Sequence, residues 1–233
     1  MAIKENLLKV RKRISLVCSK INCDPNSITI VAVSKGRTVE QIHEAVNAGI
    51  ADIGENKVQE ALIKYNKLRT QELANLRTIK WHMVGHLQTN KVKDALKIFD
   101  LIQSVDSLHL ALAINKEAAS INKIQDILIE VKTSPEVTKF GLKAADTIEV
   151  IKEISKLRNI NIKGLMTIAP IVDNPKEASP YFKILKELLD EINGLRITDY
   201  GLRVLSMGMT DDFEAAIEEG ANMIRLGRAI FEG

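Results

Sequence analysis

The sequence predicts an α/β protein, a single (β/α)8 barrel of the TIM type with an extra N-terminal helix. Eight short apolar runs alternate with segments that can be helical along the whole chain. This alternation is typical of parallel strands joined by right-handed crossovers. The length of 233 residues suits such a barrel, which typically takes roughly 250 residues. An open doubly wound sheet is the alternative, and the count of eight strands favours the closed barrel.

An amphipathic helix is predicted before the first strand. Its apolar residues recur at helical spacing on one side, namely Ile3, Leu7, Val10, Ile14, Val17 and Cys18. No linker, low-complexity tract or fixed-period repeat interrupts the chain after it. We therefore expect one domain over residues 1–233.

The strands are predicted where short apolar runs lie between turn signals. They cover residues 30–33, 52–54, 81–84, 101–105, 127–132, 163–168, 203–207 and 223–226. Helical segments follow the first seven, at residues 38–49, 56–67, 88–97, 108–119, 144–157, 175–192 and 211–219. Thr38 and Gln41 form a capping-box pattern, Pro175 suits a first helical turn, and Gly220 stands just past a helix end. We expect the last helix to be nearly absent, because the sequence ends at Gly233.

Composition and charge restrict the class of protein. The net charge is only +3, with acids and bases interspersed, which argues against a dedicated nucleic-acid surface. Two cysteines, Cys18 and Cys23, are too few for a disulfide framework and indicate a reducing compartment. No apolar stretch approaches membrane-spanning length, and the N-terminus has no secretory signal. We expect a cytoplasmic protein that binds neither nucleic acid nor membrane.

Polar residues follow the predicted strands, at the end where barrels carry their sites. Lys35 comes directly after the first strand, at residues 30–33, which is apolar and β-branched. A lysine on a rigid element can capture a carbonyl as a Schiff base, and pyridoxal 5'-phosphate (PLP) is a carbonyl that proteins hold in this way. Considered alone, Lys35 could also be a solvated lysine at a strand end.

The ends of the last two strands indicate a phosphate site, since barrels often bind phosphate there. Gly208 and Gly227 allow the backbone to approach an anion, and Thr210 offers a hydroxyl. A helix that begins at Asp211 would add its N-terminal amides. Glycines that serve turns and a threonine that caps a helix are the alternative. Together with Lys35, the pattern favours a ligand that carries both a phosphate and an aldehyde.

Arg225 lies inside an otherwise apolar strand, where an unpaired guanidinium is costly to bury. We expect it to point into the barrel mouth toward an acceptor, for which the pyridine nitrogen of PLP is one candidate. An arginine there would keep that nitrogen unprotonated and weaken the ring as an electron sink. An outward arginine paired with a helix acid is the alternative.

His82 and His86 could lie on one face of a strand. No cysteine or acid stands near enough to complete an obvious set of metal ligands. We therefore favour one packed histidine and one loop histidine, and we expect no metal.

One ordered set of motifs spans essentially the full length: VAVSK at 31–35, GENKVQE at 54–60, WHMVGHLQTNK at 81–91, GLM at 164–166, LSMGMT at 205–210, IRLG at 224–227 and AIF at 229–231. This set resembles the pyridoxal phosphate homeostasis proteins, single-domain relatives of the alanine racemase N-terminal barrel. The resemblance implies a Schiff base at Lys35, with Asn56 near the ring and Arg225 near the pyridine nitrogen of PLP. It implies phosphate contacts from Thr210, Gly227 and Arg228. We add Met166 and Ser206, at two further strand ends, to this predicted site.

The chain departs from the family pattern at several positions. Lys57 stands where the family often has Tyr, and residues 131–134 read VKTS where Val-Asn-x-Ser is usual. Thr210 replaces a common Ser and keeps the hydroxyl, whereas Arg228 stands where Thr is frequent. Glu232 interrupts the usual Ile-Phe-Gly ending. None of these changes touches the lysine.

The resemblance implies a non-catalytic protein that holds PLP and buffers or delivers it, with PLP-dependent apoenzymes as candidate recipients. Racemases of this fold take a second base from a separate domain of the partner subunit. This chain ends at the barrel, so we expect it to lack that base and to show no robust activity. We also expect a monomer, because the second domain forms the main interface of the racemase dimer. Three alternatives stay open: a slow PLP racemase or lyase that uses His82 as its acid or base, an aldolase-type barrel that binds a sugar phosphate without PLP, and a nucleic-acid or scaffold barrel.

Overall fold

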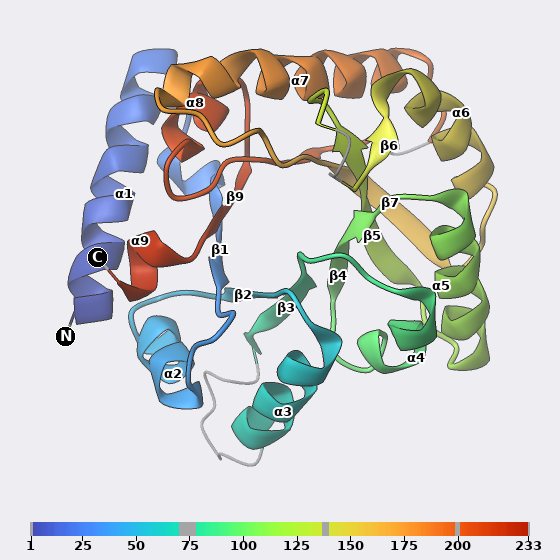
Figure 1. Cartoon of the computed structure of the whole chain (residues 1–233), viewed down its shortest axis with the longest axis horizontal. Coiled ribbons are helices and arrows are strands. Elements are labelled where there is room, and N and C mark those ends of the chain that lie inside the picture. Colours follow the sequence, from blue (N-terminus) through green and yellow to red (C-terminus); the bar gives the residue numbers. More distant parts are fainter. Residues whose placement is uncertain (1, 70–77, 137–139, 199–200, 233) are drawn as a thin grey trace.

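A computed structural model of the chain describes residues 2–69, 78–136, 140–198 and 201–232. Eight strands, all parallel, form a closed ring (Figure 1) in the order β1 (Thr29–Val33), β2 (Asp52–Glu55), β3 (Lys80–Met83), β4 (Leu101–Val105), β5 (Gln125–Lys132), β7 (Ile160–Met166), β8 (Val204–Ser206) and β9 (Met223–Leu226). The pairs β4–β5 and β1–β9 close the ring. The predicted barrel is confirmed, and the open sheet was the wrong alternative. A two-residue strand, β6 (Leu142–Lys143), adds to the end of β5.

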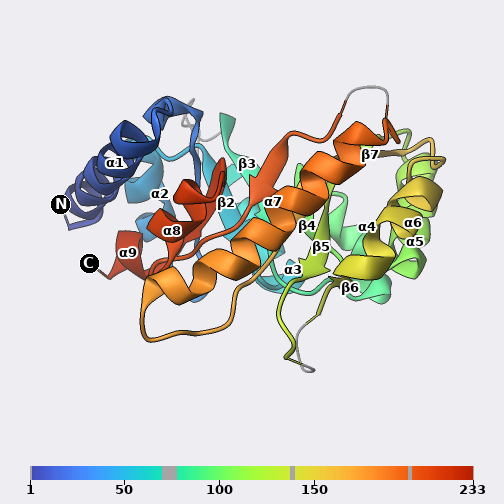
Figure 2. The same cartoon turned by 90° about the horizontal axis from the view of Figure 1, so that it is seen from above.

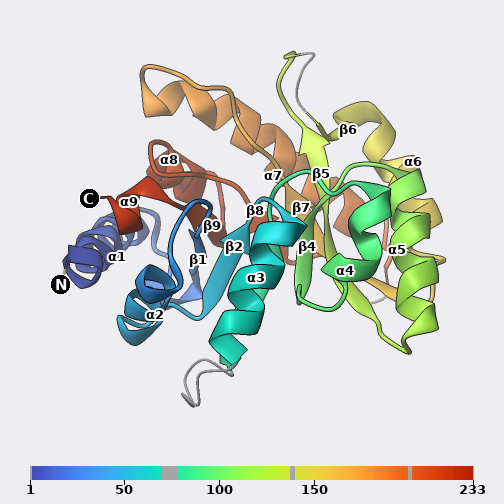
Figure 3. The same ribbon diagram turned by 60° about the horizontal axis from the view of Figure 1, so that its bottom comes forward.

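The helices surround the ring (Figure 1). They are α2 (Val39–Asn47), α3 (Val58–Arg69), α4 (Val92–Ala95), α5 (Leu108–Ser120), α6 (Ala144–Ile154), α7 (Ser179–Gly194), α8 (Phe213–Glu218) and α9 (Arg228–Phe231), with 3-10 turns η1 (Pro25–Ser27), η3 (Thr89–Lys91) and η4 (Pro175–Ala178). Seen from below, α3 lies beside β2 with α2 and α4 on either side (Figure 3). Among the described residues, no helix is both long and apolar enough to cross a membrane.

The extra N-terminal helix α1 (Ala2–Ile21) packs against α2, α8 and α9. Every apolar residue predicted for its inner side is buried, and so is Asn6, whose amide donates to the Ile230 carbonyl at 3.2 Å. Because α9 is a single turn, α1 covers the flank of the barrel that a full eighth helix would cover (Figure 1).

The predicted strands are all confirmed, with boundaries that differ by a few residues. The largest difference is in β7, which begins at Ile160 rather than at residue 163. Its first half alternates buried and partly exposed residues, so no continuous apolar run marks the start. The capping box of Thr38 and Gln41 is present at the start of α2.

Two of the predicted helices differ in form. The segment at 88–97 is a 3-10 turn followed by the four-residue α4, after which the Lys97 and Ile98 N–H groups donate three residues back, to the Asp94 and Ala95 carbonyls, at 3.2 and 3.0 Å. This turn places the Phe99 ring in the core, fully buried. The segment at 175–192 starts as the turn η4, with Pro175 at its first position, and continues as α7.

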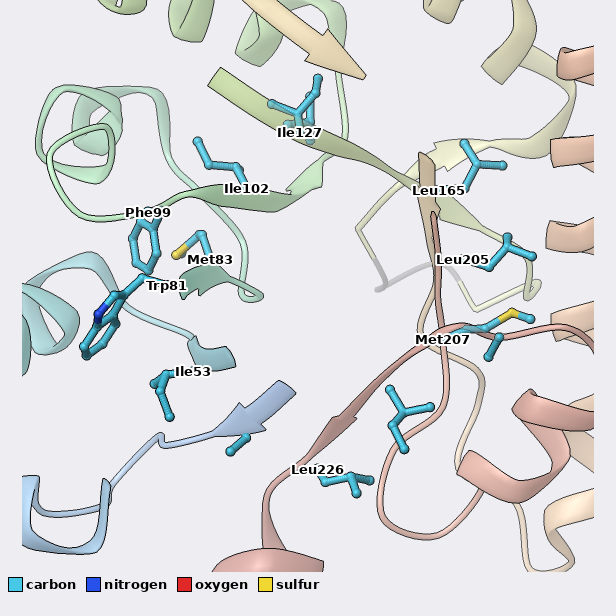
Figure 4. Close-up of a cluster of buried hydrophobic side chains, with 14 of the residues drawn as sticks. Ile53, Trp81, Met83, Phe99, Ile102, Ile127, Leu165, Leu205, Met207 and Leu226 are labelled. Carbon is cyan, nitrogen blue, oxygen red and sulfur yellow. The ribbon is translucent and has the colours of Figure 1, made fainter. Parts of the chain in front are cut away.

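The apolar core has two layers on the two sides of the ring. Outward-facing strand residues pack against the helices, as Figure 4 shows for Ile53, Trp81, Met83, Leu165, Leu205 and Leu226, among others. A smaller cluster fills the inside of the barrel and consists of Val31, Val84, Leu101, Leu128, Met166 and Met223. The interior is therefore packed, and a site can form only at the ends of the strands. The loops that follow β5 and β7 leave the barrel at the same end (Figure 2).

Candidate active site

A cavity of about 680 Å³ opens at the carboxyl ends of the strands. Its walls come from the loops that follow β1, β2, β3, β7, β8 and β9, together with Val33 at the end of β1 and Arg225 within β9. The lining residues are Val33, Lys35, Asn56, Val84, Ile168, Ile171, Met209, Thr210, Asp211, Arg225, Gly227 and Arg228. The lining therefore combines apolar side chains with polar and charged ones.

Six of the eight residues predicted for the cofactor site line this one cavity: Lys35, Asn56, Thr210, Arg225, Gly227 and Arg228. The other two do not line it. Met166 belongs to the buried cluster inside the barrel. Ser206 is also fully buried and supports the Arg225 side chain from below. Because strand side chains alternate between two sides and several depths, the end of a strand in the sequence does not tell which residue reaches the surface of the cavity.

Lys35 is exposed, but the backbone on both sides of it is held firmly. The Ser34 backbone N–H donates to the Gly54 carbonyl at 2.9 Å, and the Ser34 hydroxyl donates to a Glu55 carboxylate oxygen at 2.5 Å. On the other side, the Gly36 N–H donates to Glu60 at 2.8 Å. The backbone before and after Lys35 is thus held by hydrogen bonds, while the Lys35 side chain is exposed.

A buried lysine, Lys64 on α3, joins these contacts. Its ammonium donates to the Ser34 carbonyl at 2.6 Å and to Glu55 and Glu60 at 2.7 Å each. Burial raises the pKa of Glu55, and the hydrogen bonds from Lys64 and Ser34 oppose that shift. The second oxygen of Glu55 has no hydrogen-bond partner among the described residues. This cluster was not predicted from the sequence, although the i, i+4 spacing of Glu60 and Lys64 was a visible signal.

Arg225 is buried and points into the cavity wall as predicted, and the outward alternative is wrong. Its guanidinium donates to the Ser206 hydroxyl at 2.7 Å and to the Thr167 carbonyl at 2.8 Å. Burial lowers the pKa of Arg225 to about 10, so the group remains a cation at neutral pH. A guanidinium has five N–H donors, and these two contacts leave others that can face a ligand.

The support for Arg225 continues through the barrel interior. The Ser206 hydroxyl donates to Gln103 at 2.6 Å, and the Gln103 amide nitrogen lies 2.9 Å from His82 Nδ1. His82 Nε2 in turn lies 2.9 Å from an Asp52 carboxylate oxygen. Both ring nitrogens of His82 are therefore engaged away from the cavity, and His82 does not line it. It is a packed histidine and does not fit the role of a catalytic acid or base.

The loop after β8 is the place where the sequence predicts a phosphate site. Gly208 adopts φ +91°, and a Cβ atom there would lie 2.6 Å from the Ala216 side chain, so only glycine fits. Asp212 accepts a hydrogen bond from the Met209 N–H at 2.6 Å and closes the loop. The Thr210 hydroxyl accepts from the Ala229 N–H at 3.3 Å, which leaves its own proton free to donate to an anion.

The loop after β9 faces the loop after β8. A Cβ atom at Gly227 would meet no heavy atom closer than 3.6 Å, so the space beside its backbone is open. Arg228 forms an ion pair with Asp211, which joins the two loops at the rim. The Arg228 guanidinium is thus engaged with a carboxylate, and its backbone is the part that remains for a phosphate.

Asn56 lines the cavity, and its backbone lies against the loop that follows β3. A Cβ atom at Gly85, after β3, would lie 2.5 Å from the Asn56 carbonyl oxygen. The two loops can approach this closely only because residue 85 is glycine. His86 lies on the same loop, exposed, with Nδ1 3.2 Å from Asp106. Among the described residues, no group of three or more acids, histidines or cysteines could hold a metal ion.

The chemistry of these groups fits PLP. The cavity offers an amine, a guanidinium, and a glycine-rich loop with backbone and hydroxyl donors, and these groups suit an aldehyde, a ring nitrogen and a phosphate.

Glu130 on β5 gives the barrel interior a pH dependence. Burial, with a smaller contribution from Asp106, raises its pKa from 4.5 to about 7, while Arg225 opposes the shift. The folded protein therefore binds this proton more tightly than the unfolded chain. The resulting stability is complete below pH 4.5 and is lost as the pH rises through 7. At 1.36 kcal/mol per pKa unit, the loss is about 3 kcal/mol.

Glu130→Gln should remove this dependence. We expect the variant to match the wild type in free energy of unfolding near pH 4 and to exceed it by up to about 3 kcal/mol near pH 8. Urea unfolding at both pH values measures the difference. Glu187→Gln, an exposed change on α7, is the control. Parallel pH profiles of wild type and Glu130→Gln would contradict the assignment.

Comparison with known proteins gives the same fold and a consistent set of relatives. The family model described as alanine racemase, N-terminal domain, matches residues 2–233. A pyridoxal phosphate homeostasis protein of Aquifex aeolicus is 41% identical over 227 residues, which cover 97% of this chain and 96% of the relative. The protein of that name from Escherichia coli K12 is 33% identical and covers 98% and 95%.

Solved structures agree. PipY of Synechococcus elongatus, in a structure with PLP bound, has a TM-score of 0.85 at 33% identity and covers 98% of this chain and 99% of its own. An alanine racemase of Clostridium difficile has a TM-score of 0.74 at 16% identity, and the match covers 98% of this chain but 58% of the racemase. At that identity the racemase is evidence for the fold alone.

Proposed function

Since this chain belongs to the family of the alanine racemase N-terminal domain, with the pyridoxal phosphate homeostasis proteins as its relatives, we propose that it binds PLP and takes part in vitamin B6 homeostasis. The observation that carries the proposal is the convergence of Lys35, Arg225 and the glycine-containing loops after β8 and β9 on one cavity. PipY, which is similar over nearly its whole length, has a structure with PLP bound.

Each residue has a role that follows from its place. The Lys35 amine holds the aldehyde carbon of PLP as a Schiff base, on a backbone that Ser34 and Gly36 fix. Arg225 directs a donor at the pyridine nitrogen, while Thr210 and the backbone of Gly227 and Arg228 hold the phosphate. Asn56 lies beside the ring. A bound PLP supplies an electrophilic carbon and an electron sink. An arginine at the ring nitrogen would keep that sink weak.

The second part of the proposal is that the protein holds and delivers PLP without robust catalysis. Its relatives at 33–41% identity are named homeostasis proteins. The likeness to the racemase, at 16% identity, is a likeness of fold alone. His82, the interior candidate for an acid or base, is engaged on both ring nitrogens. We propose a monomeric, single-domain carrier that serves PLP-dependent apoenzymes in the cytoplasm. The free thiols of Cys18 and Cys23 agree with a reducing compartment.

The test is the visible spectrum of the purified protein with and without added PLP. We expect a yellow Schiff-base band that borohydride removes, with one pyridoxyl group per chain in the intact mass. Incubation with L-alanine should yield no more D-alanine than free PLP does. A protein that stays colourless with excess PLP would contradict the proposal and favour an aldolase-type barrel. Racemisation well above the free cofactor would contradict the non-catalytic part alone.

A further inference from the structure

A second cavity, of about 470 Å³, adjoins the proposed PLP cavity. It lies between the loops that follow β2 and β3, and two residues, Lys35 and Asn56, line both cavities. A ligand in the second cavity would therefore stand next to the lysine that we assign to PLP. The other residues that line this second cavity have no role in the proposed PLP site. They are Lys57, Val58, Gln59, Met83, Gly85, His86, Leu87, Gln88, Lys91 and Phe140.

The ionisable side chains that line this second cavity are all basic. Besides Lys35, its lining contains Lys57, Lys91 and His86 and no carboxylate. Within the described part of the chain, neither the Lys57 nor the Lys91 amine forms an ion pair with an acid. Asp106 contacts His86 at 3.2 Å but does not line the cavity. Basic side chains that line a concave surface with no carboxylate in its wall attract a small anion.

The remaining wall is shaped for more than a hydrated ion. The His86 ring stacks on Phe140, with ring centroids 3.8 Å apart and planes 15° from parallel. Met83 and Leu87, both buried, form the apolar floor. The site thus pairs cationic heads with an aromatic and apolar surface, the combination that fits a small organic anion.

We infer that this cavity binds the carboxylate or phosphate group of a small organic molecule beside Lys35. The inference rests on the proposed function, because a ligand in the second cavity would lie beside the PLP that we assign to Lys35. Lys57 and Lys91 hold the anionic group, and the body of the ligand lies against the stacked pair toward Lys35. An α-amino acid and a second B6 phosphate both carry such a group, and the experiment separates them.

The experiment uses protein loaded with PLP and then reduced with borohydride, so that the first cavity is filled covalently. Intact mass reports this step independently of anything that follows. The reduced protein, labelled with 15N, is titrated separately with inorganic phosphate and with L-alanine, and the amide shifts of Gly85, His86 and Lys91 are followed. We expect saturable shifts with at least one probe. Lys57→Ala and Lys91→Ala should each raise the Kd about tenfold, the worth of one charge-assisted hydrogen bond.

Lys93→Ala is the matched control, since Lys93 lies two residues after Lys91, is exposed on α4 and does not line the cavity. It should leave the Kd unchanged. Saturation by phosphate alone assigns the site to a phosphate ligand, and saturation by alanine alone assigns it to an amino acid. Absence of saturation with both probes, or equal weakening by Lys93→Ala and Lys91→Ala, would overturn the inference. If borohydride adds no mass, the PLP proposal fails, and the same titrations on untreated protein still decide whether the second cavity binds anions.

Discussion

Lys35→Ala is expected to reduce covalent PLP from one group per chain to none. The amine of Lys35 is the only lysine amine in the lining of the proposed PLP cavity among the described residues, so no other lysine there can replace it. The side chain is exposed, and its loss should change the free energy of unfolding by no more than about 0.5 kcal/mol. Absorbance after addition of PLP, followed by intact mass after borohydride, measures the effect.

Lys35→Arg separates the covalent bond from the charge. Arginine keeps a cation at the cavity but cannot form a Schiff base at neutral pH, so this variant should also lack the yellow band. Because Thr210, Gly227 and Arg225 are untouched, both variants should still bind PLP weakly and reversibly. Lys93→Ala should retain the full band. A pyridoxyl group that persists on another lysine of Lys35→Ala would disprove the assignment.

The sequence was sufficient for the architecture because barrel strands are buried on both sides. Buried parallel strands appear as short apolar runs, and eight of them were located within a few residues. Lys35, Arg225, Thr210 and Gly227 were also identifiable, because each interrupts or directly follows such a run with a group that has a distinct chemical use. Their convergence on one cavity follows from the fold, since all strand ends meet at the same mouth.

The remaining features depend on tertiary contacts that leave no local signal. The depth of Met166 and Ser206 is set by the tilt and stagger of strands in the ring, so their burial below the cavity was not predictable. The chain from Ser206 through Gln103 to His82 joins residues more than twenty positions apart. α4 ends after one turn because Phe99 must enter the core. The second cavity likewise exists only because Gly85 brings two loops together.

The contacts of Lys64 are the clearest case of tertiary contacts that the sequence does not show. Replacement of Lys64 should cause the largest loss in the free energy of unfolding among the variants proposed. Lys64→Met removes the ammonium that contacts Ser34, Glu55 and Glu60. Glu55 is fully buried and would lose its only ion-pair partner among the described residues. Leaving one member of a buried pair uncompensated costs about 3–5 kcal/mol. We expect a loss of that size in the free energy of unfolding of the PLP-free protein, measured in urea.

A double variant distinguishes lost charge compensation from lost packing. Lys64→Met combined with Glu55→Gln leaves no unpaired buried charge from the Lys64–Glu55 pair, so it should recover at least half of the loss, and the double-mutant cycle gives the coupling energy. Lys67→Met, an exposed change on the same helix, should cost no more than about 0.5 kcal/mol. Lys64→Met should also weaken PLP binding, because the backbone on both sides of Lys35 loses its anchor. A stability loss equal to that of Lys67→Met would show that the cluster does not hold this segment in place.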